Sequence, residues 1–247
     1  MVGRILSVMI SLTCFCCSAP NLPITVAHQR YRIEKKFEPD TVMVQLVNPF
    51  AAEVKKTMGE VIGFANSTMY RKQPESGLGN MMADCMQQMA ARKYGQKVDI
   101  GLINYEGIRA PIHRGNITVG SVYELMPFDN ILVLQELSGV VLEKLIQHTA
   151  SMGGWSVSAG SGYKIKDRKA VDIVIDGKPL NLKLRYTIAN TDYIANGGDN
   201  TAVLKGIPQH NKGYLLRDIL IAYIKEITAG GKPVEGRIEN RVIQWNE

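Results

Sequence analysis

One hairpin signal constrains the fold of this chain more than any other feature. The segment VDIVIDGKPLNLKLRYTIAN, residues 171–190, places Asp176-Gly177 between two apolar runs, and this dipeptide is typical of a two-residue β-hairpin turn. A hairpin joins antiparallel strands, which disfavours a doubly wound sheet of parallel strands. Helical and extended patterns alternate through the rest of the chain without a regular repeat. The sequence therefore predicts an α+β fold with layered mixed or antiparallel sheets and flanking helices.

Hydrophobic spacing and cap residues predict the helices. The strongest pattern covers residues 78–94, where apolar side chains recur at spacings of three and four and Gly95 follows as a terminator. A short helix is predicted over residues 119–125, and another begins after the N-cap Ser138. The remaining predictions are a helix that starts near Pro39-Asp40 and is interrupted at Pro49, a last helix at 213–229, and strands at 60–69, 99–104, 131–137 and 237–243.

The composition is that of an ordinary globular protein. Of the 247 residues, 45% are hydrophobic, which is enough to bury a full core in one large domain or two small ones. The formal net charge is +6, but the basic residues are dispersed and form no stripe with aromatic residues. We therefore expect no binding to nucleic acid.

The N-terminus has the pattern of an export signal. Residues 1–19 combine an early Arg4, an apolar stretch and small residues before Pro20, and the apolar run is too short for a membrane-spanning helix. We expect residues 1–19 to be a secretory or lipoprotein signal peptide, residues 20–40 an N-terminal segment and residues 41–247 the folded domain. The protein is predicted to be exported by a bacterium, as a periplasmic protein or a membrane-anchored lipoprotein.

The cysteines leave two processing outcomes open. Cys14, Cys16 and Cys17 lie at the end of the leader, where one of them is a candidate for lipid attachment. Cleavage after Ala19 without a lipid is the alternative. In both cases the folded part keeps Cys85 alone, which is expected to pack as a small apolar residue on a helix.

The segment DIGLINYEGIRAPI, residues 99–112, ends a buried strand in a polar turn. Its apolar run is typical of a strand covered on both faces, and Asn104 marks the end of that strand. Gly107 is expected to supply a position with positive φ, so that the turn can present its N–H groups or the guanidinium of Arg109 to an anion. The alternative is that Arg109 packs on a neighbouring carboxylate or carbonyl.

Four segments together resemble the C-terminal, substrate-binding domain of the 5'-nucleotidase and UDP-sugar hydrolase family. In chain order they are LGNMMADCM, INYEGIRAPI with GNITVGSVYELMPFDNILVLQELSG, GGWSVSAGSGYKI, and YTIANTDYIANGGDN. The resemblance implies that this domain binds the nucleoside part of a substrate between aromatic rings and helps to clamp its phosphate with arginines. It also implies a separate metallophosphoesterase domain that holds two metal ions and performs the hydrolysis.

The same resemblance implies roles for six residues of this chain. Arg109 matches a substrate arginine, and Asn104 matches the asparagine that opens the same loop. Phe128 matches a stacking aromatic, with a position inside the core as the alternative. The other three roles are a polar contact to the base for Asn130, a backbone approach to the base for Gly160, and a place in the NGGD turn for Asp199.

This chain departs from the family's pattern beside these residues. Tyr105 and Glu106 stand where the family's loop usually has glycines, and a carboxylate there would repel an anion unless it points away. Thr201 stands where the resemblance implies the second stacking aromatic, so the base would lose one side of its sandwich. Arg71 and Lys72 are the alternatives for a further family arginine.

The sequence shows no metal-binding pattern. The four histidines, His28, His113, His148 and His210, stand far apart, without the closely spaced ligands that a two-metal phosphoesterase needs. We expect no cofactor in this chain, and divalent metals only in a partner catalytic domain.

Two functions are consistent with these observations. The first is the nucleotide-binding half of a 5'-nucleotidase-like phosphohydrolase, which contacts the nucleoside and phosphate and acts with a separate metallophosphoesterase subunit. The second is a non-catalytic exported binding or scaffolding protein that kept the fold and lost its affinity for nucleotides.

Overall fold

The computed structural model describes residues 29–32, 34 and 38–245. The chain divides into two compact units between Val47 and Asn48. The predicted signal peptide, with its three cysteines, lies outside the described residues, and so does most of the predicted segment 20–40.

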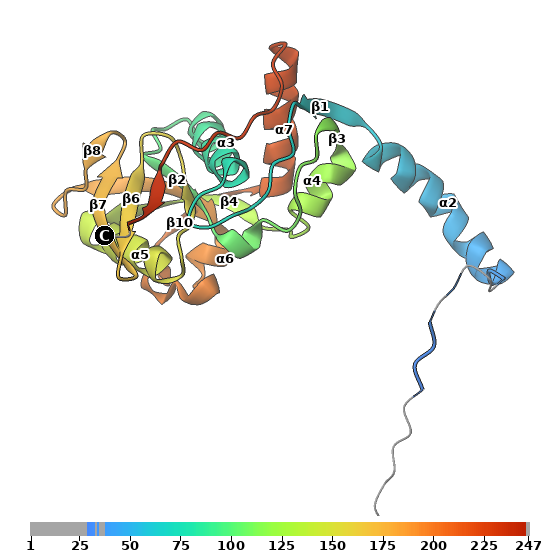
Figure 1. Ribbon diagram of the computed structural model, residues 1–247, viewed down its shortest axis with the longest axis horizontal. Helices are drawn as coiled ribbons and strands as arrows, with labels where there is room; N and C mark the ends of the chain where they lie inside the picture. Colours follow the sequence, from blue (N-terminus) through green and yellow to red (C-terminus); the bar gives the residue numbers. More distant parts are fainter. Residues whose placement is uncertain (1–28, 33, 35–37, 246–247) are drawn as a thin grey trace, which may run out of the picture. The chain divides into compact units, whose positions relative to one another are not determined.

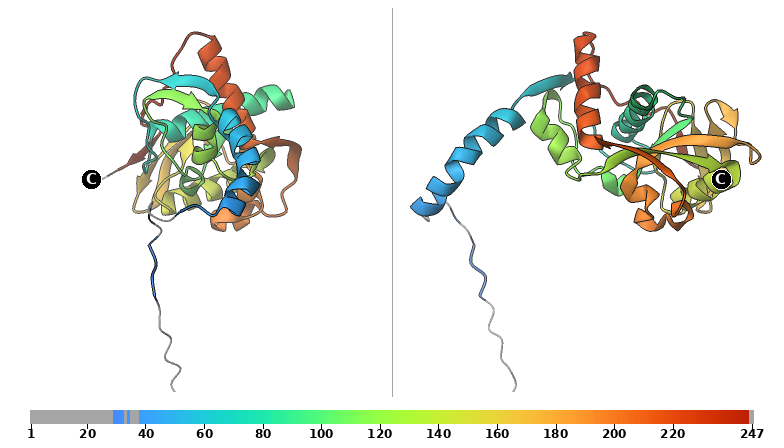
Figure 2. Two further views of the ribbon diagram at one scale, coloured as in Figure 1. Left: turned by 90° about the vertical axis from the view of Figure 1, so that its right-hand side faces the viewer. Right: turned by 180° about the vertical axis from the view of Figure 1, so that it is seen from behind.

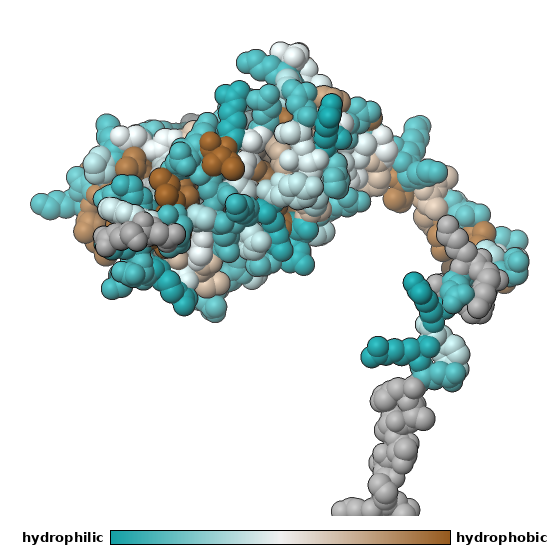
Figure 3. Space-filling view, in the orientation of Figure 1, coloured by the Kyte–Doolittle hydropathy of each residue, from teal (hydrophilic) through white to brown (hydrophobic). Residues whose placement is uncertain are grey.

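Helix α2, Thr41–Met58, begins where the sequence predicts a helix. The backbone N–H groups of Val42 and Met43 donate to Oδ1 of Asp40 at 2.9 and 3.1 Å, which is the geometry of an N-cap. The predicted interruption at Pro49 is wrong, because the helix continues through that residue. Pro49 has no backbone N–H, so one helical hydrogen bond is missing, and the flanking residues keep the remaining hydrogen bonds of the helix. Apart from the partly buried Met58, the apolar side chains of α2 are exposed, as the hydrophobic colouring over this helix shows (Figure 3).

A five-stranded mixed sheet lies at the centre of the second unit (Figure 1). Strand β2 runs parallel to β9, and the other neighbouring pairs are antiparallel. The predicted α+β class is therefore confirmed. In spatial order the strands are β10 (Gln209–Leu215), β4 (Ile131–Ser138), β9 (Arg185–Thr191), β2 (Ile100–Ile103) and β5 (Ser156–Val157).

The central sheet separates two hydrophobic cores. Along β2, Ile103 packs into the first core and Leu102 into the second, because successive side chains of a strand point to opposite faces. Helices α3 and α7 pack against each other on the first side (Figure 2). The helices of the first core are α3 (Gly77–Tyr94), α4 (Val119–Leu125) and α7 (Leu216–Ala229), and the second core contains α5 (Gly139–Ser151).

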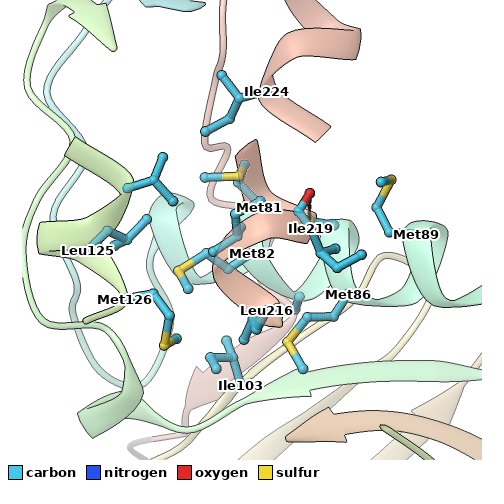
Figure 4. Packing of buried hydrophobic residues seen from close by; sticks show 14 of the residues in the cluster. Met81, Met82, Met86, Met89, Ile103, Leu125, Met126, Leu216, Ile219 and Ile224 are labelled. Atoms are coloured by element: carbon cyan, nitrogen blue, oxygen red, sulfur yellow. Dashed lines mark hydrogen bonds between the residues drawn. The ribbon is translucent and has the colours of Figure 1, made fainter. Parts of the chain in front are cut away.

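Methionines fill much of the first core (Figure 4). Met81, Met82, Met86 and Met89 of α3 are all buried there, as expected for flexible side chains that fill irregular gaps. Cys85 lies among them as a free, buried thiol whose pKa is raised by burial. The apolar face that the sequence pattern predicts for α3 is therefore the face that packs into the core.

Local capping explains where the helices begin and end. Ser76 accepts a hydrogen bond from the N–H of Gly79 at 3.0 Å at the start of α3, and Gly95 ends that helix with a φ of 69°. Ser138 is the N-cap of α5, as predicted. These caps use the orphan N–H and C=O groups that every helix end leaves.

The predicted hairpin is present in a separate four-stranded sheet. Asp176 and Gly177 have φ values of 50° and 74°, which suit a turn with two left-handed residues. The strands of this sheet are β11 (Val242–Gln244), β6 (Gly162–Lys166), β7 (Lys169–Ile175) and β8 (Lys178–Pro179), and a two-stranded sheet joins β1 (Val61–Ala65) to β3 (Gly115–Thr118).

The C-terminal elements differ from the prediction. Residues 209–215 form β10 at the edge of the central sheet, so the last helix begins at Leu216 rather than at residue 213. The segment QHNKG is polar throughout and carries no strand pattern, because its extended form comes from pairing with β4. The predicted closing strand is shorter, Val242–Gln244. Within the described part of the chain, no helix is both long and apolar enough to cross a membrane.

Candidate functional site

A hollow of about 210 Å³ opens on the surface where three loops of the second unit meet. The loops follow β2, precede β4 and contain the NGGD turn. Five of the six predicted site residues line this hollow, although their predicted contacts with a ligand stay predictions. The lining residues are Asn104, Glu106, Gly107, Arg109, Phe128, Asn130, Tyr193 and Asp199.

The loop after β2 is a single 3-10 turn, η2 (Tyr105–Gly107). The N–H of Arg109 donates to the carbonyl of Leu125 at 2.9 Å, which fastens the loop while the side chain of Arg109 stays 48% exposed. Gly107 is not among the residues with positive φ, so the conformational reason given for it is wrong. A Cβ at Gly107 would lie 2.5 Å from Oδ1 of Asn104, and glycine is needed for this close approach.

Glu106 points toward two arginines, of which Arg109 lines the hollow. Its Oε2 lies 3.1 Å from NH1 of Arg71 and 3.8 Å from NH1 of Arg109. Arg71 also donates to the carbonyls of Tyr105 and Ile108, and its guanidinium lies 4.4 Å from the centre of the Tyr105 ring. Arg71 is therefore the basic residue that holds this loop, and it also pairs with Glu106, a lining residue of the hollow.

Phe128 presents an open aromatic face. The side chain is 40% exposed, which excludes the alternative position inside the core. The guanidinium of Arg109 lies 5.7 Å from the centre of its ring, within the range of a cation–π contact. Arg109 therefore has the predicted carboxylate neighbour and still faces the hollow.

Helix α7 fixes the turn that carries Phe128. The buried Arg217 donates to Oδ1 of Asp129 at 2.8 Å and to the carbonyl of Phe128 at 3.4 Å. The N–H of Leu216 donates to the carbonyl of Asn130 at 2.8 Å. Sequence reasoning missed Arg217, because no local signal links it to a turn almost ninety residues earlier in the chain.

Asp199 connects three elements around the hollow. Its Oδ2 accepts from Nδ2 of Asn104 at 2.6 Å, and its Oδ1 accepts from the hydroxyl of Tyr193 at 2.9 Å. Its carbonyl lies 2.7 Å from Nε2 of His148 on α5. The hydrogen bond to Asp199 raises the pKa of Tyr193. Both oxygens of the carboxylate are thus engaged by neutral donors, which hold the walls of the hollow in place.

Tyr193 supplies an aromatic wall that sequence reasoning missed. It lies on α6 (Asp192–Ala195) and is 47% exposed. The position after the NGGD turn, Thr201, is fully buried, and its hydroxyl donates to the carbonyl of Ile194 at 2.6 Å. The aromatic ring beside the turn therefore comes from a residue before it. The sequence signal for this wall was Tyr193, the second tyrosine in the segment YTIANTDYIANGGDN.

Gly198 sets the position of the Tyr193 ring. A Cβ at Gly198 would lie 2.5 Å from that ring, so we expect Gly198→Ala to displace the half-exposed ring and to lower the free energy of unfolding by about 0.5–1.5 kcal/mol, because the Tyr193 hydroxyl would lose its hydrogen bonds with Asp199. Chemical denaturation measures this change. Gly230→Ala is the control, because its added methyl would lie 3.3 Å from the nearest atom. Equal stabilities of the two variants would contradict the packing argument.

Gly160 lies apart from the other predicted site residues. It lines a different surface depression, together with Asp172 and Asn240, and its carbonyl accepts from the N–H of Gly177 at 2.7 Å. Its φ of 80° serves the turn before β6. The structure does not bring Gly160 to the hollow.

The described residues contain no metal-ligand cluster. Within them, no three His, Cys, Asp or Glu side chains gather in a way that could hold a metal ion. Oδ1 of Asn104 is buried and accepts no hydrogen bond from the described residues.

Comparison with known proteins assigns the family. A sequence profile described as 5'-nucleotidase, C-terminal domain matches residues 51–206. The chain belongs to this family. The 5'-nucleotidase of Vibrio vulnificus (strain CMCP6) is 25% identical over 211 residues, which cover 80% of this chain and 36% of that protein. Protein UshA of Escherichia coli (strain K12) is 25% identical over 194 residues, which cover 74% of this chain and 34% of UshA.

Solved structures agree with this assignment. The crystal structure of the 5'-nucleotidase precursor from Thermus thermophilus matches with a TM-score of 0.71 and 29% sequence identity, over 85% of this chain and 44% of that one. The predicted relationship to 5'-nucleotidase C-terminal domains is therefore confirmed. The chain spans about a third of the length of the two curated relatives named above.

Proposed function

We propose that this 5'-nucleotidase C-terminal domain is the substrate-binding half of a nucleotide phosphohydrolase and holds the nucleoside part of the substrate. One observation carries the proposal: Phe128, Tyr193 and Arg109 line the same solvent-open hollow. A nucleobase needs flat apolar faces on which to stack, and the two rings offer them. A ribose needs fixed donors and acceptors, and Asn130 lines the same walls together with Asp199, which the amide of Asn104 holds through a hydrogen bond of 2.6 Å.

The chemistry of hydrolysis would come from a second component. The match covers only 36% of the 5'-nucleotidase of Vibrio vulnificus. Most of that relative therefore lies outside the part that aligns with this chain. We propose that a separate metallophosphoesterase chain supplies the two divalent metals and the attacking water. This chain then binds and orients the nucleoside while the phosphate lies in the partner's site.

The proposed location is outside the cytoplasm. The leader pattern in residues 1–19 supports export, and the cysteines at its end support attachment through a lipid as the alternative to simple cleavage. A membrane-anchored protein would require a partner that is exported to the same side of the membrane.

Phosphate release tests the division of labour. We expect the purified protein with Mg²⁺, Mn²⁺ or Zn²⁺ to release no phosphate from AMP, and a mixture with an exported metallophosphoesterase from the same organism to release it. Arg109→Ala should lower the activity of the mixture by about two- to fivefold, because the Phe128 ring loses the guanidinium that lies 5.7 Å from its centre, and an exposed contact of this kind contributes about 0.5–1 kcal/mol. Release of phosphate by the isolated chain would overturn the proposal.

One observation favours a second candidate, a binding or scaffolding protein without nucleotide affinity. The guanidinium of Arg109 already forms an ion pair with the carboxylate of Glu106 at 3.8 Å. A ligand that binds Arg109 must therefore share the guanidinium with Glu106 or displace that carboxylate. Calorimetry with adenosine, AMP and a UDP-sugar separates the two candidates. Absent or millimolar binding that Arg109→Ala does not change would favour the scaffold.

A further inference from the structure

The charges around the hollow do not form an anion clamp. Its lining contains one cation, Arg109, and two carboxylates, Glu106 and Asp199. Asp199 has neutral partners, Asn104 and Tyr193, so no cation at the hollow offsets its charge. A phosphate placed here would meet a surface that is balanced or slightly negative, although the chain as a whole carries a formal charge of +6.

Glu106 lies beside the guanidinium of Arg109, which is the only cation among the described residues that line the hollow. Its Oε2 is 3.8 Å from NH1 of Arg109, and its side chain is 59% exposed toward solvent and the hollow. A phosphate oxygen that binds the same guanidinium would come about as close to the carboxylate. At a protein surface, two like charges about 4 Å apart change a dissociation constant by about tenfold or more.

Arg71 keeps this carboxylate in place. Its NH1 lies 3.1 Å from Oε2 of Glu106, and the same atom donates to two carbonyls of the loop. The side chain of Arg71 is 33% exposed, and its guanidinium is stacked on the ring of Tyr105. A rotation of the Glu106 side chain away from Arg109 would still have to break its ion pair with Arg71. The ion pair with Arg71 therefore keeps the negative charge of Glu106 beside the hollow.

We propose that Glu106 makes the hollow select the uncharged nucleoside end of a ligand and keeps phosphate away from Arg109. This inference rests on the proposed function and adds the residue that discriminates between an uncharged nucleoside and its phosphate. A carboxylate is an acceptor, and the hydroxyl groups of a ribose are donors, so Glu106 favours the sugar at the place where it disfavours an anion. The phosphate of a nucleotide then points out of the hollow, toward the partner component.

Calorimetry on the full chain with adenosine and AMP tests this selection. We expect the unaltered protein to bind AMP no more tightly than adenosine. Glu106→Gln keeps the size of the side chain and removes its charge, so it should raise the affinity for AMP by about tenfold while the affinity for adenosine changes less than threefold. The gain should shrink as salt rises from 0.05 to about 0.5 M, because salt screens exposed charges.

Glu60→Gln is the matched control. Glu60 is an exposed glutamate that is paired with Lys225 at 2.7 Å away from the hollow, and its replacement should leave the AMP-to-adenosine ratio unchanged. If the unaltered protein binds adenosine but prefers AMP, and Glu106→Gln does not move that ratio, the inference fails and the proposed function stands. If neither protein binds either ligand, both fail.

Discussion

Replacing Arg241 by Met is expected to lower the free energy of unfolding by about 3–5 kcal/mol. The Arg241 side chain is only 7% exposed and forms a two-point ion pair with Asp84, at 2.7 and 2.8 Å. It also donates to Glu239 and to the carbonyl of Val157. Met fills much of the same volume and leaves the carboxylate of Asp84, 19% exposed, without its cation. The cost comes from this stranded charge.

The position of Arg241 explains why the effect should be large. The guanidinium joins the C-terminal segment to α3 through Asp84 and to β5 through Val157. The backbone of Arg241 also takes part, since its carbonyl accepts from the N–H of Tyr163 at 2.8 Å. Loss of the side chain therefore weakens the attachment of two elements at once, the last strand β11 and helix α3.

Urea denaturation of the full chain measures the effect. Arg237→Met is the matched control: Arg237 is 75% exposed and is paired with Glu235 at 3.0 Å, and exposed pairs of this kind contribute about 0–1 kcal/mol. The double variant Asp84→Leu with Arg241→Met should lose less than the sum of the two single losses, because it strands no buried charge, and the other carboxylate partner of Arg241, Glu239, is 45% exposed to water. A loss below about 1 kcal/mol for Arg241→Met would show that the pair contributes no more than an exposed one.

Local patterns predicted those elements whose cause is local. The helix predicted at 78–94 is α3, because apolar periodicity and Gly95 act within the segment itself. The helix predicted at 119–125 matches α4, and the Asp176-Gly177 hairpin forms between β7 and β8. Each of these signals lies within a few residues of the structure that it specifies.

Elements that depend on distant partners were missed. Strand β10 is polar and exists because it pairs with β4, which lies more than seventy residues earlier in the chain. The same limit applies to the site. Asn104, Arg109, Phe128, Asn130 and Asp199 were found through a resemblance that spans several segments, whereas the contact of Arg217 with the turn at Asp129 depends on where α7 packs. Tyr193 was visible in the sequence, but its position in the wall of the hollow depends on the close approach of its ring to Gly198.

Phe128→Ala is expected to weaken adenosine binding by about 5- to 150-fold. Stacking of a base on an aromatic ring contributes about 1–3 kcal/mol per base, which corresponds to this range of dissociation constants. The ring is 40% exposed and supports no buried core, so its removal should leave the free energy of unfolding nearly unchanged. Calorimetry measures the affinity, and urea denaturation confirms the fold.

The two rings of the hollow make the prediction specific. Tyr193→Ala should weaken adenosine binding by a similar factor. Tyr193→Phe keeps the aromatic face and loses the two hydrogen bonds of the hydroxyl with Asp199, one donated to Oδ1 at 2.9 Å and one accepted from the backbone N–H at 3.2 Å, so its effect on adenosine binding should stay below tenfold. Phe64→Ala is the control, because Phe64 is a comparable exposed ring, at 44%, on β1 and outside the hollow. If Phe128→Ala changes adenosine binding no more than Phe64→Ala does, the base does not stack on Phe128. Since the hollow has no third aromatic ring among its lining residues, nucleoside recognition by stacking there would then depend on Tyr193 alone.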